Sequence, residues 1–283
     1  MLRSNNFLTS GPVMSACRKN LTAWKFGAAR AIEWLRGFRM AACLLAVFTC
    51  ATTQAGTVHV AVAANFSAPL KAIASAFELD TRHQVLTSSG ATGKLFAQVT
   101  SGARFDVFLS ADEVAITRLE QSGHAVTGTR FTYATGRLAL WSALASAVDG
   151  DGAVLKTGAF SKIAIASPKS APYGRAAIET LTRLGLLDSF APKFVTGESI
   201  GQTYSFVATG NAPLGFVALS QVMENGRLKG GSVWLVPANL HHALRQDAAL
   251  LAHGKTNAAA VAFLQFLKTD KAIAIMRSFG YAP

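Results

Sequence analysis

The 283-residue sequence has little cysteine, few acidic residues and no long apolar run. All three cysteines, Cys17, Cys43 and Cys50, lie within the first 55 residues. The rest of the chain therefore offers no disulfide, no thiolate nucleophile and no cysteine metal site. The apolar run at 40–50 has eleven residues, whereas a membrane-spanning helix needs about 20. Disulfide-rich and thiol-based classes are thus excluded for residues 56–283.

The short apolar run has the surroundings of a secretory signal. Basic residues between Arg30 and Arg39 precede the run at 40–50, and the small-residue stretch ATTQA follows it. A positive region, an apolar region and small residues, in that order, define such a signal. We predict cleavage after Ala55, which makes segment 1–55 a leader and the protein an exported, periplasmic one.

The sequence alone allows two alternatives for the start of the leader and for a lipid anchor. Its length fits either an extended positive region or a true start at Met14 or Met40. A lipid anchor on Cys50 is the rival prediction, although the bulky Phe48 and Thr49 before it make a poor lipidation motif.

The basic charge of the chain is divided between the leader and the remainder. The leader contains seven of the 27 Lys and Arg residues and one of the 15 Asp and Glu residues. It therefore carries +6 of the formal net charge of +12. The other basic residues are scattered rather than clustered, so we expect no binding of nucleic acid. A modest positive field still favours the arrival of anions.

Residues 56–283 alternate short β-rich runs with helical segments, which is typical of α/β sheets with parallel strands. The expected strands are 57–64, 83–89, 105–111, 137–143, 162–168, 193–196, 215–220 and 232–237. The expected helices are 68–78, 94–100, 113–121, 175–184, 202–208 and an apolar stripe within 258–280.

This order predicts a two-lobed α/β architecture with a hinge and a ligand cleft between the lobes. We expect 56–134 to form the first lobe, 135–237 the second, and 238–283 to return to the first. The chain would cross between lobes near Thr135 and near Pro237. No internal repeat or low-complexity linker interrupts it.

Four strand-to-helix turns share small, polar residues, namely 64–67, 88–93, 167–174 and 196–201. The N-terminus of a helix offers unpaired N–H donors and a partial positive charge, which suit an anion. Ligands of open α/β sheets also sit at the carboxyl ends of strands, where these turns lie. The turns therefore indicate an anion site if they converge.

The simpler interpretation is that Asn65, Ser67, Ser88 and Thr92 are ordinary N-caps, which such turns need in any case. Each turn taken singly favours that interpretation. Convergence of four turns cannot be deduced from their spacing.

Two motifs point to other chemistry. The segment 90–94 has only two residues between its glycines and no hydroxyl after its lysine, so it does not match a nucleotide-binding loop. The segment Gly197-Glu198-Ser199-Ile200-Gly201 matches G-x-S-x-G, the nucleophile turn of α/β-hydrolases. Asp247 and His253 are the downstream acid and base in the required order, so an exported serine hydrolase using Ser199 remains the alternative function.

The adjacent His241 and His242 do not indicate a metal site, because neighbouring residues do not face one way and no carboxylate lies at ligand spacing. We expect both to be surface residues.

Several longer segments together resemble the periplasmic molybdate-binding proteins of ABC importers. The resembling segments are AVAANFSAPLKAIASAFE, SSGATGKLFAQVTSGARFDVFLSAD, NAPLGFVALSQV and FLQFLKTDKAIAIMRSFGY. The likeness covers nearly all of residues 56–283. It implies two α/β lobes that close on a dehydrated tetrahedral dianion held by hydroxyls, an amide and backbone N–H groups.

The resemblance also implies which residues hold the anion. Asn65 takes the first-turn position, Thr92 the second-turn hydroxyl position, and Tyr173 and Ile200 the positions where the family donates backbone N–H. Some members add a tyrosine hydroxyl after the APLG strand, but Ala218 stands there in this sequence. Whether Tyr173 supplies that hydroxyl or only its N–H stays open.

The function implied is the substrate-binding component of an ABC transporter, without catalysis. It would capture molybdate, and also tungstate, and deliver it to a membrane permease. Molybdenum would enter only as the oxyanion held by the four residues above, with no other metal and no cofactor, and we expect a monomer. A protein of the same fold for another oxyanion, such as sulfate, is the remaining alternative.

Overall fold

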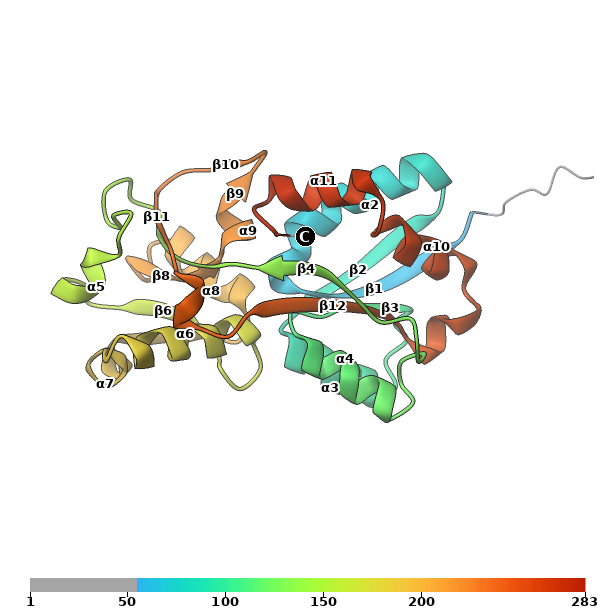
Figure 1. Cartoon of the computed structure of the whole chain (residues 1–283), viewed down its shortest axis with the longest axis horizontal. Coiled ribbons are helices and arrows are strands. Elements are labelled where there is room, and N and C mark those ends of the chain that lie inside the picture. The colour runs from blue at the N-terminus through green and yellow to red at the C-terminus, as the bar shows by residue number, and fades with distance from the viewer. Residues whose placement is uncertain (1–54, 283) are drawn as a thin grey trace, which may run out of the picture. The chain divides into compact units, whose positions relative to one another are not determined.

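The computed structural model describes residues 55–282 (Figure 1). The predicted leader up to residue 54, with all three cysteines, lies outside these residues. Within 55–282, the helices are too short or too polar to cross a membrane.

The first sheet is mixed. Strand β1 pairs in parallel with β2 and β3, whereas β12 is antiparallel to both β3 and β4. Its five strands, in spatial order, are β2 (Gln84–Gly90), β1 (Thr57–Ala63), β3 (Val107–Leu109), β12 (Leu244–Leu250) and β4 (Phe131–Gly136).

Helices cover both faces of this sheet (Figure 1), which is why β1 is apolar on both sides. Val58 and Val60 belong to one core, where the ring of Phe77 lies 5.3 Å from that of Phe263, and Ala61 belongs to the opposite core. On the first face lie α2 (Ser67–Thr81), α10 (Ala258–Phe266) and α11 (Asp270–Ser278), and on the second α3 (Thr92–Thr100) and α4 (Glu113–Gln121). Two 3-10 turns, η1 (Ala64–Phe66) and η4 (Ala252–Thr256), complete this lobe.

The second sheet has the order β11 (Ser232–Leu235), β5 (Leu138–Ser142), β8 (Leu214–Ala218), β6 (Ile163–Ala166) and β7 (Phe194–Gly197). Strand β6 is parallel to β7 and β8, and β5 is antiparallel to β8 and β11. Two separate cores, one with Leu181 and one with Val207, lie against α6 and α8. The helical segments are α5 (Ala153–Thr157), α6 (Pro172–Arg183), α7 (Leu187–Phe190), η2 (Ala191–Lys193), α8 (Ile200–Ala208), α9 (Leu219–Val222) and η3 (Ala238–Leu240), and β9 (Met223–Glu224) with β10 (Arg227–Leu228) forms a small hairpin.

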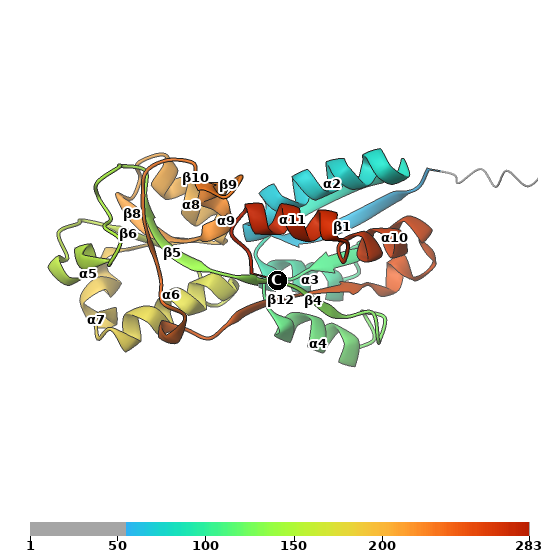
Figure 2. The same cartoon turned by 45° about the horizontal axis from the view of Figure 1, so that its top comes forward.

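Two connections join the sheets, and both use strands that the sequence analysis did not predict. The chain leaves the first sheet at the end of β4 and enters β5 after Arg137, and it returns from β11 to β12 through 236–243. Figure 2 shows β4 continuing into β5 and the return segment reaching β12. The strands that leave and return run in opposite directions, so the expectation of parallel sheets holds only in part.

Candidate ligand site

A small cavity lies where the four strand-to-helix turns meet. Asn65, Thr92, Tyr173 and Ile200 all line it, and each is at most 4 % exposed. The other lining residues are Ala63, Ala64, Gly90, Ala91, Ala111, Ala171 and Pro172. The structure therefore brings together the residues that spacing alone could not place together, and every residue of this lining is uncharged.

Three of the four helical segments that open at the cavity lack side-chain caps, and the fourth, α8, is capped by Ser199. The N-caps of η1, α3 and α6 are Ala63, Ala91 and Ala171, and none of them makes a side-chain hydrogen bond. The simpler interpretation of the polar residues as N-caps is therefore wrong for the first two turns, since Phe66 precedes α2 and Ala91 precedes α3. First-turn N–H groups have no intrahelical acceptor, so these helix ends are open to an anion.

The Thr92 hydroxyl is oriented by one backbone donor. The N–H of Ala111 donates to Thr92 Oγ1 over 3.1 Å. A hydroxyl has one proton to donate and two lone pairs. Because Ala111 occupies a lone pair, the Thr92 proton stays available for an acceptor in the cavity.

The Asn65 amide has an unusual hydrogen-bond balance. Its Nδ2 donates to Gln246 Oε1 and to the Tyr281 hydroxyl, both at 2.9 Å. Its Oδ1 is buried and finds no hydrogen-bond partner among residues 55–282. A buried acceptor without a donor costs about 1–3 kcal/mol. This side chain is therefore the one polar group of the cavity lining whose orientation calls for an explanation.

The Tyr173 hydroxyl lies behind the cavity, against the connection between the sheets. Gln246 Nε2 donates to it over 3.1 Å. A Cβ atom built on Gly136, the last residue of β4, would fall only 2.1 Å from this hydroxyl oxygen. The N–H of Tyr173, in contrast, is in the first turn of α6. This arrangement favours the backbone N–H as the donor that Tyr173 offers to the cavity.

Three buried tyrosines around Gln246 give the fold a pH dependence. Burial is the largest cause that raises the pKa of Tyr133 and of Tyr173 well above 10, and it raises the pKa of Tyr281 to about 12. A pKa that is higher in the folded state gives a stabilisation that is complete below the unfolded value of about 10. The stabilisation is lost as the pH rises through the folded value.

We therefore expect the free energy of unfolding to fall from about pH 10 upward and to keep falling towards about pH 12. Urea unfolding at a series of pH values measures it. Tyr281→Phe removes one of the three titrating groups, so the free energy of unfolding of this variant should fall less steeply with pH. An unchanged free energy of unfolding between about pH 9 and 11.5, or equal slopes for both proteins, would contradict this account.

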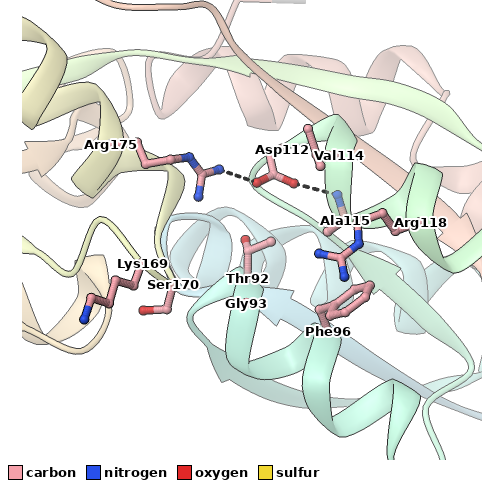
Figure 3. Close-up of a pocket in the computed structure, with 10 residues that line it drawn as sticks. All are labelled: Thr92, Gly93, Phe96, Asp112, Val114, Ala115, Arg118, Lys169, Ser170 and Arg175. Atoms are coloured by element: carbon pink, nitrogen blue, oxygen red, sulfur yellow. Dashed lines mark hydrogen bonds and ion pairs between the residues drawn. The ribbon is translucent and has the colours of Figure 1, made fainter.

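A larger pocket with charged residues lies outside the cavity (Figure 3) and shares Thr92 with it. Arg175 Nη2 lies 2.6 Å from Asp112 Oδ2, so the arginine points at a carboxylate of the other lobe. Lys94 and Glu198 form a second pair between the lobes. Between these pairs, the N–H of Gly93 donates to the carbonyl of Ser170 over 2.9 Å. The lobes are thus held together at the mouth of the cavity.

The residues of the hydrolase alternative are engaged elsewhere. Ser199 is the N-cap of α8 and accepts from the N–H of Gln202 over 3.2 Å. Asp247 pairs with Arg130, and His253 Nδ1 lies 3.1 Å from Asp106 Oδ1. Within the described part of the chain, Ser199, Asp247 and His253 make no hydrogen bond with one another. The G-x-S-x-G segment is therefore explained by helix capping.

The two adjacent histidines differ from each other. His242 is exposed and bonds to Glu179 over 3.0 Å, as expected of a surface residue. His241 is only 7 % exposed, and its Nδ1 bonds to the His242 carbonyl, so the prediction of a surface position is wrong for it. Its position beside η3, which packs against α6, buries it. Within 55–282, no group of three His, Cys, Asp or Glu residues could hold a metal ion.

A family model matches the chain over nearly all of its described residues. Residues 58–282 match the model of the family described as bacterial extracellular solute-binding protein. The chain belongs to this family. The match begins in β1 and ends at the last described residue, so both sheets and the cavity between them are features of a solute-binding protein.

Relatives of this solute-binding protein carry more specific names. It is 52 % identical over 243 residues to a protein of Azotobacter vinelandii named molybdate-binding protein ModA, which covers 86 % of this chain and 96 % of the relative. The protein of the same name from Rhodobacter capsulatus is 52 % identical over 227 residues, covering 80 % and 88 %. The resemblance found in the sequence analysis is confirmed by these relatives.

Solved structures agree with the two-lobed fold. The periplasmic molybdate-binding protein of Azotobacter vinelandii superposes with a TM-score of 0.78 at 41 % identity, covering 80 % of this chain and 99 % of that chain. The sulfate-binding protein SubI of Mycobacterium tuberculosis has a TM-score of 0.68 at 17 % identity, over 81 % and 87 %, and shows the fold alone. The predicted α/β, two-lobed fold class is confirmed.

Two polar residues behind the cavity were not predicted from the sequence. Gln246 and Tyr281 both contact Asn65, and Gln246 contacts Tyr173 as well. The available signal was weak: a glutamine in the polar stretch Arg245-Gln246-Asp247, and a tyrosine two residues before the end of the sequence. Nothing in their spacing connects them with a turn that lies some 200 residues earlier.

Proposed function

We propose that this solute-binding protein captures molybdate, and also tungstate, as the substrate-binding component of an ABC transporter. The observation that carries the proposal is the uncharged cavity, in which residues of four strand-to-helix turns from two lobes line one small volume. The names of the relatives support the choice of molybdate among the oxyanions.

The chemistry of the lining suits a fully deprotonated oxyanion. Such an anion only accepts hydrogen bonds, so a site made of donors without carboxylates favours it over a protonated phosphate. Hydrogen bonds to charged groups contribute about 1.5–3 kcal/mol each, so six or seven can support nanomolar affinity, near −12 kcal/mol, after the cost of association. Asn65, Thr92, Tyr173 and Ile200 are the proposed ligand residues.

Closure of the lobes completes this site, since the lining comes from both. The first lobe supplies Asn65 and Thr92, and the second supplies Tyr173 and Ile200. An anion that contacts both pairs shifts the open and closed populations towards the closed form. The closed form is the one proposed to dock on the permease.

The remaining parts of the proposal follow from this role. The protein acts in the periplasm as a monomer, after removal of a leader by cleavage behind Ala55. It carries no cofactor and catalyses no reaction. The first lobe comprises 56–134 with 238–283, and the second lobe comprises 135–237.

Calorimetric titration of residues 56–283 with molybdate, tungstate, sulfate and phosphate tests the proposal. We expect molybdate and tungstate to bind at micromolar or tighter Kd, and sulfate and phosphate at least about 100-fold more weakly, a difference of about 2.7 kcal/mol. Sulfate binding tighter than molybdate would assign the site to the other oxyanion. The absence of binding at micromolar concentrations would overturn the proposed function.

Replacing Arg175 with glutamine should change molybdate affinity by less than about fivefold, because a partly exposed ion pair contributes about 1 kcal/mol or less. Titration of Arg175→Gln measures it, and Asp112→Asn removes the same pair from the other side as a matched control. A loss above about 50-fold in Arg175→Gln alone would mean that the guanidinium contacts the ligand, which the neutral-donor site does not allow.

A further inference from the structure

A buried polar cluster joins the candidate site to the connection between the lobes. We define it as Asn65, Tyr133, Tyr173, Ser220, Gln246 and Tyr281. Each member is at most 6 % exposed. Gln246 is its centre, because its amide contacts Asn65 of the first lobe, Tyr173 of the second, and Tyr133 of β4.

One atom of this cluster remains unsatisfied with the amides as they stand. Asn65 Oδ1 is buried without a donor among residues 55–282, whereas the Tyr173 hydroxyl accepts from Gln246 Nε2 and also lies beside the Tyr281 hydroxyl. Buried polar groups without partners are rare and require a reason.

Turning both amides over replaces the unpartnered acceptor at the cavity, Asn65 Oδ1, by the donor Nδ2 without moving any other atom. An amide offers two donors at nitrogen and an acceptor at oxygen, in nearly the same shape. Asn65 Oδ1 would then accept from Gln246 Nε2 and from the Tyr281 hydroxyl at the same 2.9 Å separations. The single proton of Tyr281 would turn to Asn65 Oδ1 from the Asn65 carbonyl and Ser220 Oγ, each 3.0 Å away. The Tyr173 hydroxyl would donate to Gln246 Oε1 at 3.1 Å.

The other hydroxyl protons of the cluster have acceptors in this arrangement too. Tyr133 donates to the carbonyl of Ser110 over 3.2 Å, while its oxygen accepts from Gln246 Nε2. Ser220 donates to the Asn65 carbonyl over 2.7 Å. Asn65 Nδ2 then occupies the position of the unpartnered atom, on a residue that lines the cavity.

We propose that Gln246 and Tyr281 are positioning residues that hold the Asn65 amide with its oxygen towards the hinge and its Nδ2 free to donate to the oxyanion. The proposal rests on the proposed function, because the donor is offered to the anion. Gln246 and Tyr281 act through Asn65 and do not contact the ligand. Neither lines the cavity.

Aromatic packing keeps the cluster in place. The ring of Phe66 lies 4.7 Å from that of Tyr133 and 5.3 Å from that of Tyr281, with an edge-to-face angle of 68° in both cases. Both tyrosine rings are therefore held against one buried ring. They form a matched pair, because only Tyr281 contacts Asn65, whereas Tyr133 contacts Gln246 and Ser110.

A double-mutant cycle tests the proposal, with Kd for molybdate as the readout. Tyr281→Phe should weaken binding about tenfold in the wild-type background, which corresponds to about 1.4 kcal/mol, and less than twofold in the Asn65→Ala background. Tyr133→Phe is the control and should weaken binding less than about threefold in both backgrounds. If Tyr281 only stabilised the fold, Tyr281→Phe would weaken molybdate binding by the same factor with and without the Asn65 amide.

A second measurement needs no variant at the positioning residues. In protein labelled with ¹⁵N asparagine, the Asn65 side-chain signals are those missing from the Asn65→Ala spectrum. We expect these NH₂ proton signals to shift downfield on addition of molybdate, as a hydrogen bond to an anion forms. Equal factors in both backgrounds of the cycle, or Asn65 NH₂ signals that do not move when molybdate binds, would overturn the proposal. Absence of molybdate binding to the wild type would instead overturn the proposed function.

Discussion

Replacing Ile200 with proline is expected to weaken molybdate binding about 10- to 100-fold, the value of one hydrogen bond to a charged group. Ile200 is the first residue of α8, where the N–H has no intrahelical acceptor and proline fits the backbone. Ser199 before it is extended, with φ −141° and ψ 164°, as a residue before proline prefers. The substitution therefore removes a donor without breaking the helix.

Ile200→Ala is the matched control, because it shortens the buried side chain but keeps the N–H. Titration calorimetry gives both affinities, and urea unfolding shows whether both chains fold. Since the side chain only packs the wall, the alanine variant should bind within about fivefold of wild type, a change of about 1 kcal/mol. Equal losses in both variants would show that the Ile200 backbone does not hold the ligand.

Replacing Gly136 with alanine is the second change with a large expected effect. The new Cβ would lie 2.1 Å from the Tyr173 hydroxyl and 2.4 Å from Gln246 Nε2, distances that force one of these groups to move. Overfilling a packed interior costs about 1–3 kcal/mol. Both displaced groups belong to the buried polar cluster next to the candidate site. We therefore expect a loss of stability together with at least tenfold weaker molybdate binding.

Gly150→Ala provides the control, because a Cβ at Gly150 would have no atom within 4 Å. It should leave both stability and affinity near wild type. Urea unfolding and calorimetric titration of the two variants measure the two effects. A Gly136→Ala variant that binds and unfolds like wild type would mean that the space between β4 and Tyr173 is not constrained as described.

The candidate site was largely predictable because its chemistry lies in local sequence. Each proposed ligand residue follows a short strand and opens a helix, so Thr92 and Ile200 could be placed at helix N-termini from sequence alone. The absence of side-chain caps at η1, α3 and α6 could not be predicted, because it depends on where each helix begins. Ala91 and Ala171 became N-caps, although polar residues stand nearby in both turns.

The connection between the lobes was less predictable from the sequence, because residues of β12 are buried by segments that lie far away along the chain. Strand β12 contains Arg245-Gln246-Asp247, a polar stretch that argues against a buried strand, yet Gln246 and Asp247 are 0 % and 1 % exposed. A register shift between these two residues interrupts the pairing with β4. Gln246 then bonds to Asn65 and Tyr173, while Asp247 pairs with Arg130. These partners come from distant segments, and local sequence does not reveal them.

We propose that neutral donors inside the small cavity hold the oxyanion, and that the basic residues at its mouth do not. A crystal structure of residues 56–283 with molybdate, with the metal located by its anomalous scattering, tests this most directly. We expect one molybdenum atom among Asn65, Thr92, Tyr173 and Ile200, with oxygens at hydrogen-bond distance from their N–H and O–H groups. Molybdenum in the outer pocket beside Arg118, Lys169 and Arg175, with an empty inner cavity, would contradict it.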